Sequence, residues 1–353
     1  MKFVYRIGLA GAFALGALVL TAVPANASGN SKHVHVVQPG QSIQDAVDAA
    51  HPGDTIVLKA GNYAGGILVS TDRLTIRGAG ASTVLRDTGT NQCTEAIQTP
   101  SGICVADPSG GTVSRVTIKN LTVKRFDGFG VFGFGTDRLT VTGVHALFNT
   151  EYGITEFNST RGSFVGNVVI GSTEEAGLYV GDIADARGTV VKNNIAIGNA
   201  LGLLVRHAHN VRVTGNKFIG NCTGIALVDD GQPGGQGDTV VMHNVIDRNN
   251  RSCPAGEEAP PLQGTGVLIF GGHDNTIKNN EIIGNRGNVD TSAGVFLAPG
   301  SEGNHIVHNV IQGNKSSGQP ADVIDASGNS TNVFKNNRCG ASVPTNICAN
   351  SHM

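Results

Sequence analysis

Charged side chains recur in the middle of the sequence, each time directly after a short apolar segment. Segments 178–180, 203–205 and 225–227 alternate in the manner of β-strands that bury one face. If these segments stack in register, residues one layer apart lie about 5 Å from each other, and Asp182 and Asp229 lie about 9–10 Å apart. The charged residues that follow these segments, or hold the corresponding place one repeat earlier, are Glu156, Asp182, Arg206, His207, Asp229 and Asp230.

This pattern predicts a pair of basic side chains, Arg206 and His207, between two acidic layers. Such a site can bind the carboxylate of an acidic sugar and shift the pKa values of its own side chains. It suits abstraction of the proton next to a uronate carboxylate, the first step shared by β-elimination and uronate epimerisation. We expect Arg206 to bind or polarise the carboxylate and His207 to serve as base or acid. Asp182 and Asp229 then position or tune them, and Glu156 is a further catalytic candidate.

The same residues allow other functions. Two carboxylates such as Asp182 and Asp229, roughly 6.5–9.5 Å apart, would suit an inverting glycoside hydrolase. Alternatively, the charges form a solvated ladder of ion pairs, and the protein binds a glycan or a partner protein without catalysis. A maturation or scaffold role is a third possibility.

Residues for substrate and metal binding are also indicated near this edge. Tyr152 and Tyr179 could stack on sugar rings, although the chain has no Trp and only 5% aromatic residues. Asn158 and Asp230 complete the predicted substrate-binding set. Asp229 and Asp230 could bind calcium through their oxygens, and no other cofactor is expected.

The elements that position these residues repeat along the chain. Segments 190–199 and 212–221 are two copies of one unit, and similar short β runs recur about every two dozen residues, as in solenoids. We expect the recurring asparagines to form a corner, because Asn tolerates the left-handed conformation and stacked amides can bond to one another. These positions are Asn120, Asn167, Asn194, Asn216, Asn244, Asn280, Asn309 and Asn337, with Gly143 in the second repeat.

The predicted fold is therefore all-β: a right-handed, single-stranded parallel β-helix in one domain, 28–353. Regular rungs are expected over 116–337, some nine or ten in all. Ser42 can cap a short amphipathic helix over 42–50, and this helix would cover the open first rung. Residues 87–112 are expected to form a loop.

The N-terminal part of the predicted β-helix, residues 39–78, resembles secreted right-handed parallel β-helix proteins of the pectate-lyase-like superfamily. The similar stretches are Pro-Gly-Gln-Ser-Ile-Gln at 39–44, Pro-Gly-Asp-Thr-Ile at 52–56, Gly-Asn-Tyr at 61–63 and Leu-Thr-Ile-Arg-Gly at 74–78. The resemblance implies the fold, and the superfamily holds lyases, hydrolases, epimerases and proteins without known activity.

Residues 152–157 look like the Tyr-Gly-Phe-Asp-Pro-His segment of mannuronan C-5 epimerases. Tyr152 and Gly153 match, but the family's Asp and His fall on Thr155 and Phe157. The resemblance therefore implies a shared scaffold. For the epimerase chemistry itself, Glu156, Asp182 or His207 would have to substitute.

The first residues predict export. Lys2 and Arg6 precede an apolar run over 7–23 and an Ala-Asn-Ala site at 25–27, so 1–27 is interpreted as a signal peptide. We expect a secreted monomer that has no membrane contact after cleavage and acts on a polysaccharide or surface glycan. A net charge of −2 does not suggest a nucleic-acid partner.

Six cysteines in an exported chain favour disulfides over free thiols. The pairs Cys93–Cys104 and Cys339–Cys348 would close short local loops. Cys222 and Cys253 follow the second Asn of successive repeats, so stacking would bring them together. The spacings fit a zinc site poorly, because no C-x-x-C pair is present.

Overall fold

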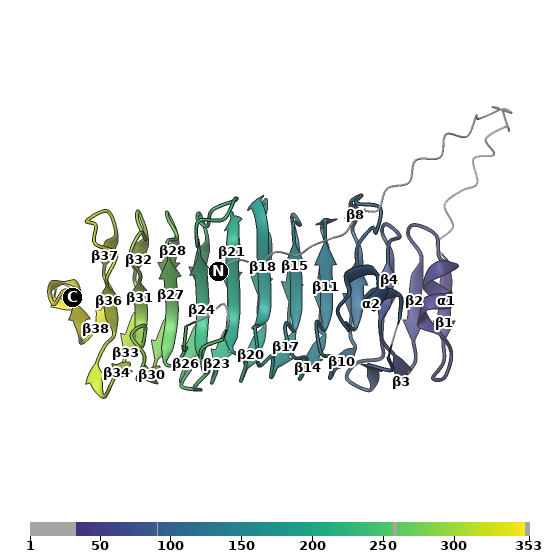
Figure 1. The fold of residues 1–353 in the computed structure, drawn as a ribbon, viewed down its shortest axis with the longest axis horizontal. Helices are drawn as coiled ribbons and strands as arrows, with labels where there is room; N and C mark the ends of the chain where they lie inside the picture. The colour runs from purple at the N-terminus through teal and green to yellow at the C-terminus, as the bar shows by residue number, and fades with distance from the viewer. Residues whose placement is uncertain (1–32, 90, 257–259, 350–353) are drawn as a thin grey trace, which may run out of the picture.

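The chain folds as one long parallel β-helix, seen from the side in Figure 1. A computed structural model describes residues 33–89, 91–256 and 260–349. The predicted signal peptide, 1–27, lies outside the described residues. Within these ranges no helix is long and apolar enough to cross a membrane.

Three parallel sheets form the walls of the β-helix, and consecutive rungs contribute neighbouring strands to each. Sheet A contains β1 (Val34–Val37), β2 (Thr55–Leu58), β5 (Thr75–Arg77), β9 (Thr117–Lys119), β13 (Thr140–Thr142), β16 (Ser163–Val165), β19 (Val190–Lys192), β22 (Arg212–Thr214), β25 (Val240–Met242), β28 (Thr276–Lys278), β32 (His305–Val307) and β37 (Val333–Lys335). Sheet B contains β3 (Gly61–Ala64), β6 (Thr83–Arg86), β10 (Thr122–Lys124), β14 (His145–Leu147), β17 (Val168–Ile170), β20 (Ile195–Ile197), β23 (Lys217–Ile219), β26 (Val245–Asp247), β29 (Glu281–Ile283), β33 (Val310–Gln312) and β38 (Arg338–Cys339).

Sheet C carries the predicted functional edge. Its strands are β4 (Ile67–Val69), β7 (Ile103–Val105), β11 (Val131–Phe134), β15 (Ile154–Phe157), β18 (Ala176–Asp185), β21 (Leu201–His209), β24 (Thr223–Val228), β27 (Thr265–Phe270), β31 (Ala293–Leu297), β36 (Val323–Asp325) and β39 (Ser342–Val343). Two small sheets pair β8 (Val113–Ser114) with β12 (Thr136–Asp137), and β30 (Arg286–Gly287) with β34 (Lys315–Ser316) and β35 (Gln319–Pro320). Stacking begins at β1, well before residue 116, so the described part has more rungs than the nine or ten expected.

The interior is filled by the inward residues of each strand. Leu178 pairs in register with Leu203, which pairs with Ile225, and all three are fully buried. The neighbouring column, Val180, Val205 and Leu227, is equally buried. The predicted alternation of these strands is confirmed.

Asparagines form a continuous ladder inside one corner. Asn194 is 1% exposed, and its side-chain amide donates to Oδ1 of Asn216 at 3.0 Å; Asn216 donates in turn to Asn244 at 2.9 Å. A second ladder runs through Asn199, Asn221, Asn249, Asn285 and Asn314. The amides therefore bond along the stack, as predicted.

The left-handed residue at this corner is the one before each ladder asparagine, and this corrects the sequence prediction. Asn193 has φ 54° and Gly215 has φ 68°. Asn120, with φ 55°, and Gly143 hold this outer position too, so neither belongs to the buried ladder.

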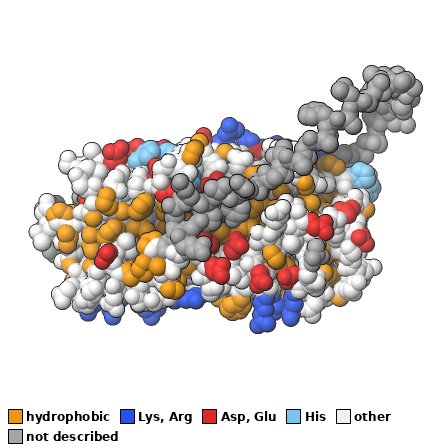
Figure 2. Space-filling model, in the orientation of Figure 1, with side chains coloured by type: hydrophobic (Ala, Val, Ile, Leu, Met, Phe, Trp, Pro, Cys, Tyr) orange, Lys and Arg blue, Asp and Glu red, His pale blue; other side chains and the backbone are white. Residues whose placement is uncertain are grey.

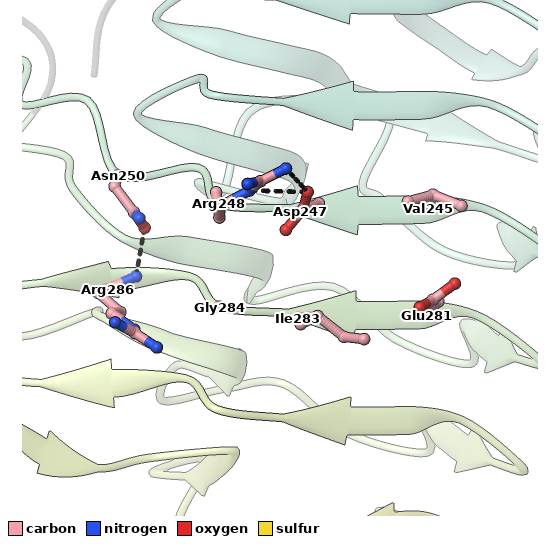
Figure 3. A pocket seen from close by; sticks show the side chains of 8 residues that line it. All are labelled: Val245, Asp247, Arg248, Asn250, Glu281, Ile283, Gly284 and Arg286. Atoms are coloured by element: carbon pink, nitrogen blue, oxygen red, sulfur yellow. Dashed lines mark hydrogen bonds and ion pairs between the residues drawn. The ribbon is translucent and has the colours of Figure 1, made fainter.

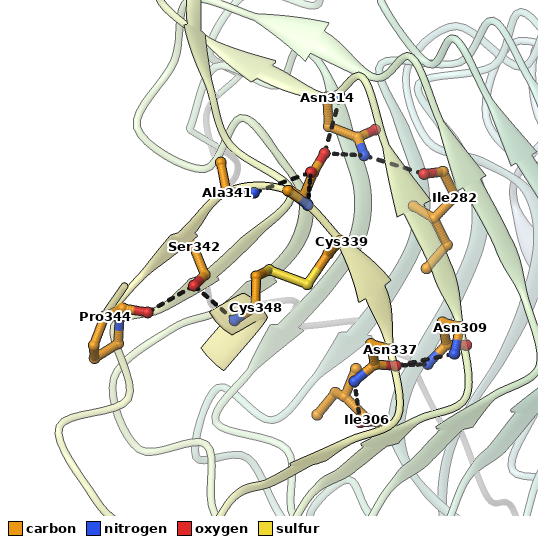
Figure 4. The surroundings of a disulfide bond; sticks show 12 residues. Ile282, Ile306, Asn309, Asn314, Asn337, Cys339, Ala341, Ser342, Pro344 and Cys348 are labelled. Carbon is orange, nitrogen blue, oxygen red and sulfur yellow. Dashed lines mark hydrogen bonds between the residues drawn. A yellow bond between two sulfur atoms is a disulfide. The ribbon is translucent and has the colours of Figure 1, made fainter. Parts of the chain in front are cut away.

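The two ends of the β-helix are closed differently. At the N-terminal end α1 (Ile43–Asp48) buries Ile43 and Val47, and Ser42 caps it by accepting from the N–H of Asp45. At the C-terminal end Oδ1 of Asp322 accepts both the N–H and the amide of Asn314, which ends the second ladder. At the same end, the Cys339–Cys348 disulfide joins the α3 helix (Asn346–Ala349) to strand β38 (Figure 4).

All three predicted disulfides are present: Cys93–Cys104, Cys222–Cys253 and Cys339–Cys348. The segment 87–112, expected to be a loop, contains α2 (Gln92–Ile97) and β7 instead. Asn91 caps α2 by accepting from the N–H of Thr94. The Cys93–Cys104 disulfide therefore ties a short helix to a strand of sheet C.

Glu156 points into the interior, so its predicted place on the outer edge is wrong. It pairs in register with Val180 of the core column and is 1% exposed. Its Oε1 accepts from the Thr189 hydroxyl at 2.9 Å, and Gly162, lacking a Cβ, leaves room for the carboxyl. Burial raises the pKa of Glu156 to about 7, against the opposing effect of the Thr189 hydrogen bond.

Replacing Asn216 by Ala should destabilise the protein by about 2–4 kcal/mol, because buried groups of Asn194 and Asn244 lose their partners. Thermal and denaturant unfolding of the oxidised protein would measure this loss. Asn193→Gly is the control: Asn193 is exposed and left-handed, and we expect a change within about 0.5 kcal/mol. Equal losses in both variants would contradict the ladder's role.

The stability of a Glu156→Gln variant relative to wild type should increase with pH. The folded-state pKa of about 7 lies above the ordinary value of 4.5, so folded wild type retains a proton that the unfolded chain has already released. Wild type therefore loses stability as pH rises between these values, by about 3 kcal/mol in total. Unfolding of both proteins at pH 4.5 and 8 tests this, and a pH-independent difference between them would refute it.

Candidate functional site

The predicted charged edge lies where the strands of sheet C end and the chain turns toward sheet A. Asn158, Asp182 and His207 occupy one column of left-handed corner residues, with φ of 47°, 53° and 49°. Asn158 donates its N–H to the carbonyl of Gly181, and Gly181 pairs with Arg206. The register predicted for this edge is therefore present. Since other corners contain left-handed residues too, these φ values reflect the fold rather than local strain.

His207 lies between two carboxylates from neighbouring rungs. Its Nδ1 is 2.9 Å from Oδ1 of Asp182, and its Nε2 is 2.5 Å from Oδ1 of Asp230. The other oxygen of Asp230 accepts from Nη2 of Arg206 at 2.7 Å. These four side chains form one connected network, which we call the His207 network.

Most of this network is removed from water. The side chains of Arg206, His207 and Asp230 are 6%, 4% and 8% exposed, whereas Asp182 is 43% exposed. A solvated ion-pair ladder would leave all of them accessible. Removing charges from water costs free energy even when they are paired, so this arrangement is not explained by a gain in stability alone.

The pKa values in the network follow from two opposing effects. Burial by itself favours the neutral imidazole, but the hydrogen bonds to Asp182 and Asp230 outweigh it and raise the pKa of His207. Burial likewise opposes ionisation of Asp230, yet His207 and Arg206 lower its pKa. The pKa of Arg206 is raised, since Asp230 outweighs the effect of burial. A carboxylate oxygen lies within hydrogen-bond distance of each ring nitrogen, which is the arrangement that suits a protonated His207 donating from both.

Tyr179 lies next to the network on the outer face of sheet C. It is 1% exposed, and its hydroxyl lies over Gly181, where a Cβ would come within 2.3 Å of the oxygen. Glycine at 181 therefore allows the phenol to reach this position. Burial, followed by the charge of Asp182, raises the pKa of Tyr179 well above its ordinary value, so the phenol is neutral.

The remaining predicted residues lie apart from the network. Tyr152 belongs to an aromatic cluster that includes Tyr179, with ring centroids 5.1 Å apart, and its hydroxyl lies 3.1 Å from the carboxylate of Glu175. Asn158 is exposed one rung from Asp182. Both stay predictions as substrate-binding residues.

The structure assigns the position predicted for Asp229 to Asp230 instead. Oδ1 of Asp229 accepts the N–H of Gly231 in its own turn, while Asp230 reaches back to Arg206 and His207. The choice between two adjacent aspartates depends on the path of segment 229–238, which the repeat does not determine. This segment also covers His207, because a Cβ at Gly234 would lie 3.1 Å from the His207 carbonyl oxygen.

The contacts do not fit calcium at this pair of aspartates. Both oxygens of Asp230 already bond to cationic groups, and Asp229 accepts a hydrogen bond within its turn. Among the described residues, no group of three or more His, Cys, Asp or Glu side chains could hold a metal ion. A requirement for calcium stays a prediction.

A surface depression of about 460 Å³ lies elsewhere, on the outer face of sheet B (Figure 3). Asp247 and Arg248 form an ion pair of 2.7 Å along one side, and Asn250 accepts the N–H of Arg286 along another. The ion pair joins two of the four charged residues that line the depression, Asp247, Arg248, Glu281 and Arg286. The chemistry predicted from the sequence lies at a buried corner of a different sheet.

Comparisons with known proteins agree on the fold. No curated protein matches the chain. Among solved structures, the chain is similar to the A-module of the Azotobacter vinelandii mannuronan C-5 epimerase AlgE6, with 18% identity and a TM-score of 0.61 over 84% of this chain and 88% of that one. The alginate lyase from Paenibacillus sp. str. FPU-7 gives 15% identity and 0.58 over 85% and 99%, and the DFA-IIIase from Arthrobacter chlorophenolicus A6 gives 14% and 0.51 over 81% and 84%.

The family model for the right-handed beta helix region matches residues 56–233 and 172–309, more than half of the chain. These residues include the strands that carry the His207 network. The chain therefore belongs to the right-handed β-helix family, as the pattern of its repeats predicted.

Proposed function

We propose that this protein acts on a uronate-containing polysaccharide, as a lyase or an epimerase, by abstracting the proton next to the carboxylate. The observation that carries the proposal is the His207 network, in which an imidazole is held by Asp182 and Asp230 beside Arg206. Structural relatives named as a mannuronan epimerase and an alginate lyase have the same fold, which is compatible with this reaction.

Arg206 is the proposed carboxylate-binding residue. A guanidinium offers a planar fork of donors that matches a carboxylate, and Nη2 of Arg206 already donates to one carboxylate oxygen of Asp230. Neutralising the substrate carboxylate makes the adjacent C–H bond more acidic. Proton abstraction then becomes possible for a side chain of moderate basicity.

His207 is the proposed base. Asp182 orients the ring through Nδ1, and Asp230 occupies Nε2 in the resting protein. Access of a substrate to Nε2 requires that Asp230 withdraws, and Asp230 belongs to segment 229–238, which contains four glycines. We propose that substrate binding displaces this segment, so that the substrate carboxylate replaces Asp230 at Arg206.

Tyr179 supplies a second proton-transfer group. Its phenol is protonated, and the hydroxyl lies over Gly181 beside the network, so it can donate a proton. In elimination, His207 removes the proton next to the carboxylate, a C=C bond forms as the bond to the glycosidic oxygen breaks, and that oxygen takes the proton of the Tyr179 hydroxyl. In epimerisation, the carbon is reprotonated from the opposite face. The direction from which Tyr179 approaches the sugar decides between the two outcomes.

The paired-carboxylate hydrolysis is less compatible with these contacts. Hydrolysis needs two carboxyl groups that face the scissile bond from opposite sides. Here Asp182 and Asp230 bond to the same imidazole, and Glu156 is enclosed in the core.

Three disulfides are compatible with the proposed secretion, whereas the monomeric state stays a prediction.

Wild-type protein should convert at least one of a panel of uronans, giving unsaturated products by ultraviolet absorbance or epimerised sugars by NMR. Substituting Gln for His207 should lower kcat/KM at least about 100-fold, which is typical for loss of a general base. Arg248→Gln, in the depression on sheet B, is the control and should keep full activity. The proposal fails if no uronan is turned over, or if the His207 variant retains activity.

The pH profile provides an independent test. A base must be neutral, and the pKa of His207 is raised, so kcat/KM should increase with pH and level off above the ordinary histidine range. Asp182→Asn removes one of the two bonds that raise this pKa. In this variant the rise of kcat/KM with pH should therefore occur at lower pH. A rise at the same pH as in wild type would argue against His207 as the base.

Loss of Asp230 should affect folding as well as activity. Asp230→Asn leaves the buried cations of Arg206 and His207 poorly compensated, and we expect a loss of about 3–5 kcal/mol in the free energy of unfolding. The adjacent Asp229→Asn variant, measured by the same unfolding assay, should change stability by less than about 0.5 kcal/mol. Similar effects of the two substitutions would show that the network does not depend on Asp230.

A further inference from the structure

Five arginines occupy the same corner position on successive rungs, beside the corner that carries His207. All five have left-handed backbones, with φ between 51° and 59°. They follow the column of Asn158 and Asp182 by a few residues, in the turn that leads from sheet C to sheet A. We call this set the arginine ladder: Arg73, Arg115, Arg138, Arg161 and Arg187.

Main-chain hydrogen bonds keep the arginine ladder in register. The N–H of each of the first four arginines donates to the carbonyl of the residue directly before the next arginine. These bonds are Arg73 to Ser114 at 2.8 Å, Arg115 to Asp137 at 2.8 Å, Arg138 to Thr160 at 2.9 Å and Arg161 to Ala186 at 2.8 Å. With about 4.8 Å per rung, the five positions span about 19 Å along the axis.

The arginine ladder is only partly neutralised. Asp137 pairs with Arg161 at 2.6 Å and with Arg138 at 3.3 Å, and their side chains stay 38% and 44% exposed. Arg73, Arg115 and Arg187 are exposed, and no ion pair joins them to a carboxylate of the described residues. Three guanidinium groups can therefore accept an external anion without first breaking an ion pair.

The sign of the charge reverses on the far side of the His207 network. Beyond Arg187 the equivalent left-handed residues are Asn210, Asp238 and Asp274. Figure 2 shows the same change along the upper edge of the molecule, with acidic and histidine side chains toward its C-terminal end and basic ones near the middle. Asp238 and Asp274 lie in contact with His209 and His273. The column of arginines therefore ends at Arg187, and a polyanion bound at His207 is attracted toward the N-terminal rungs.

We propose that the arginine ladder binds the part of a linear acidic polysaccharide that extends from the His207 network toward the N-terminal end. The inference rests on the proposed function for the position of the reacting sugar. A polyuronate carries one carboxylate per sugar, so successive charges can meet successive guanidinium groups. Each of these can form two parallel hydrogen bonds with a carboxylate.

The test is direct binding of polymannuronate and polygalacturonate, measured by calorimetry at low ionic strength. Arg73 and Arg115 lie five and four rungs from His207, about 24 and 19 Å along the axis, beyond the reach of a trisaccharide bound there. The double variant Arg73→Asn/Arg115→Asn keeps residues that tolerate the left-handed backbone. It should bind the polymer about three- to tenfold more weakly and the trisaccharide as wild type does, with a smaller effect of added salt.

The control variant is Arg125→Asn/Arg248→Asn. Both of its arginines are exposed and left-handed, but they lie at the corner between sheets B and C. It should bind the polymer as wild type does. Equal weakening in both variants, unchanged binding in the ladder variant, or absence of polymer binding by wild type would overturn the proposal.

Binding and turnover separate the two proposals. If polymer binding depends on the arginine ladder but no product forms, the proposed reaction fails and the ladder stands. If product forms, and the ladder variant binds and converts the polymer as wild type does, the proposed binding role of the arginine ladder is wrong and the proposed reaction is supported.

Discussion

Pairing of each rung with the next through main-chain hydrogen bonds is the constraint on which the whole molecule depends. It brings residues that are 22 to 36 positions apart in the sequence to within about 5 Å of each other. The Asn194–Asn216 contact, the Cys222–Cys253 disulfide and the Asp182–His207 contact all result from this single operation. Fold and candidate site are therefore products of one register.

The same register explains how charges are brought together in a chain with few of them. Only 15% of the residues are charged, yet Asp182, Arg206, His207 and Asp230 meet because consecutive rungs end at the same edge. The network is buried partly because segment 229–238 folds back over it. The raised pKa of His207 is a consequence of that enclosure between two acids rather than of burial, which by itself would favour the neutral ring.

Much of this arrangement could be predicted from the sequence, because the spacing of recurring residues gives the length of one rung. The β-helix, the buried columns at Leu178 and Val180 and the three disulfides follow from the spacing of Asn, Gly and Cys. The limits are equally specific. A carboxyl in the same column as Val180 contradicts hydrophobic alternation, so the sequence pattern predicts the wrong face for Glu156. Gly162, only six residues further along the chain, provides the space that permits it.

Other details depend on segments outside the repeat. Which of Asp229 and Asp230 contacts His207 is determined by an irregular turn, and its path is not encoded in any period. The sequence predicts the left-handed positions one residue too late for most rungs, because Asn fits both the turn and the ladder. Asn193 and Asn194 lie side by side in the sequence and perform these two roles separately.

The way the second asparagine ladder ends gives the fold a direction. Every amide in the stack accepts on one side and donates on the other, so a terminal asparagine would present an unused donor. The carboxylate of Asp322 has acceptors only. Its Oδ1 accepts a hydrogen bond from the side-chain amide of Asn314, and its Oδ2 accepts from the N–H groups of Gly340 and Ala341. Asp322 is 5% exposed and has no donor left for a further rung, so this ladder ends inside the protein. The second ladder is thus closed by a side chain that cannot continue it, and this opposes the addition of another rung there.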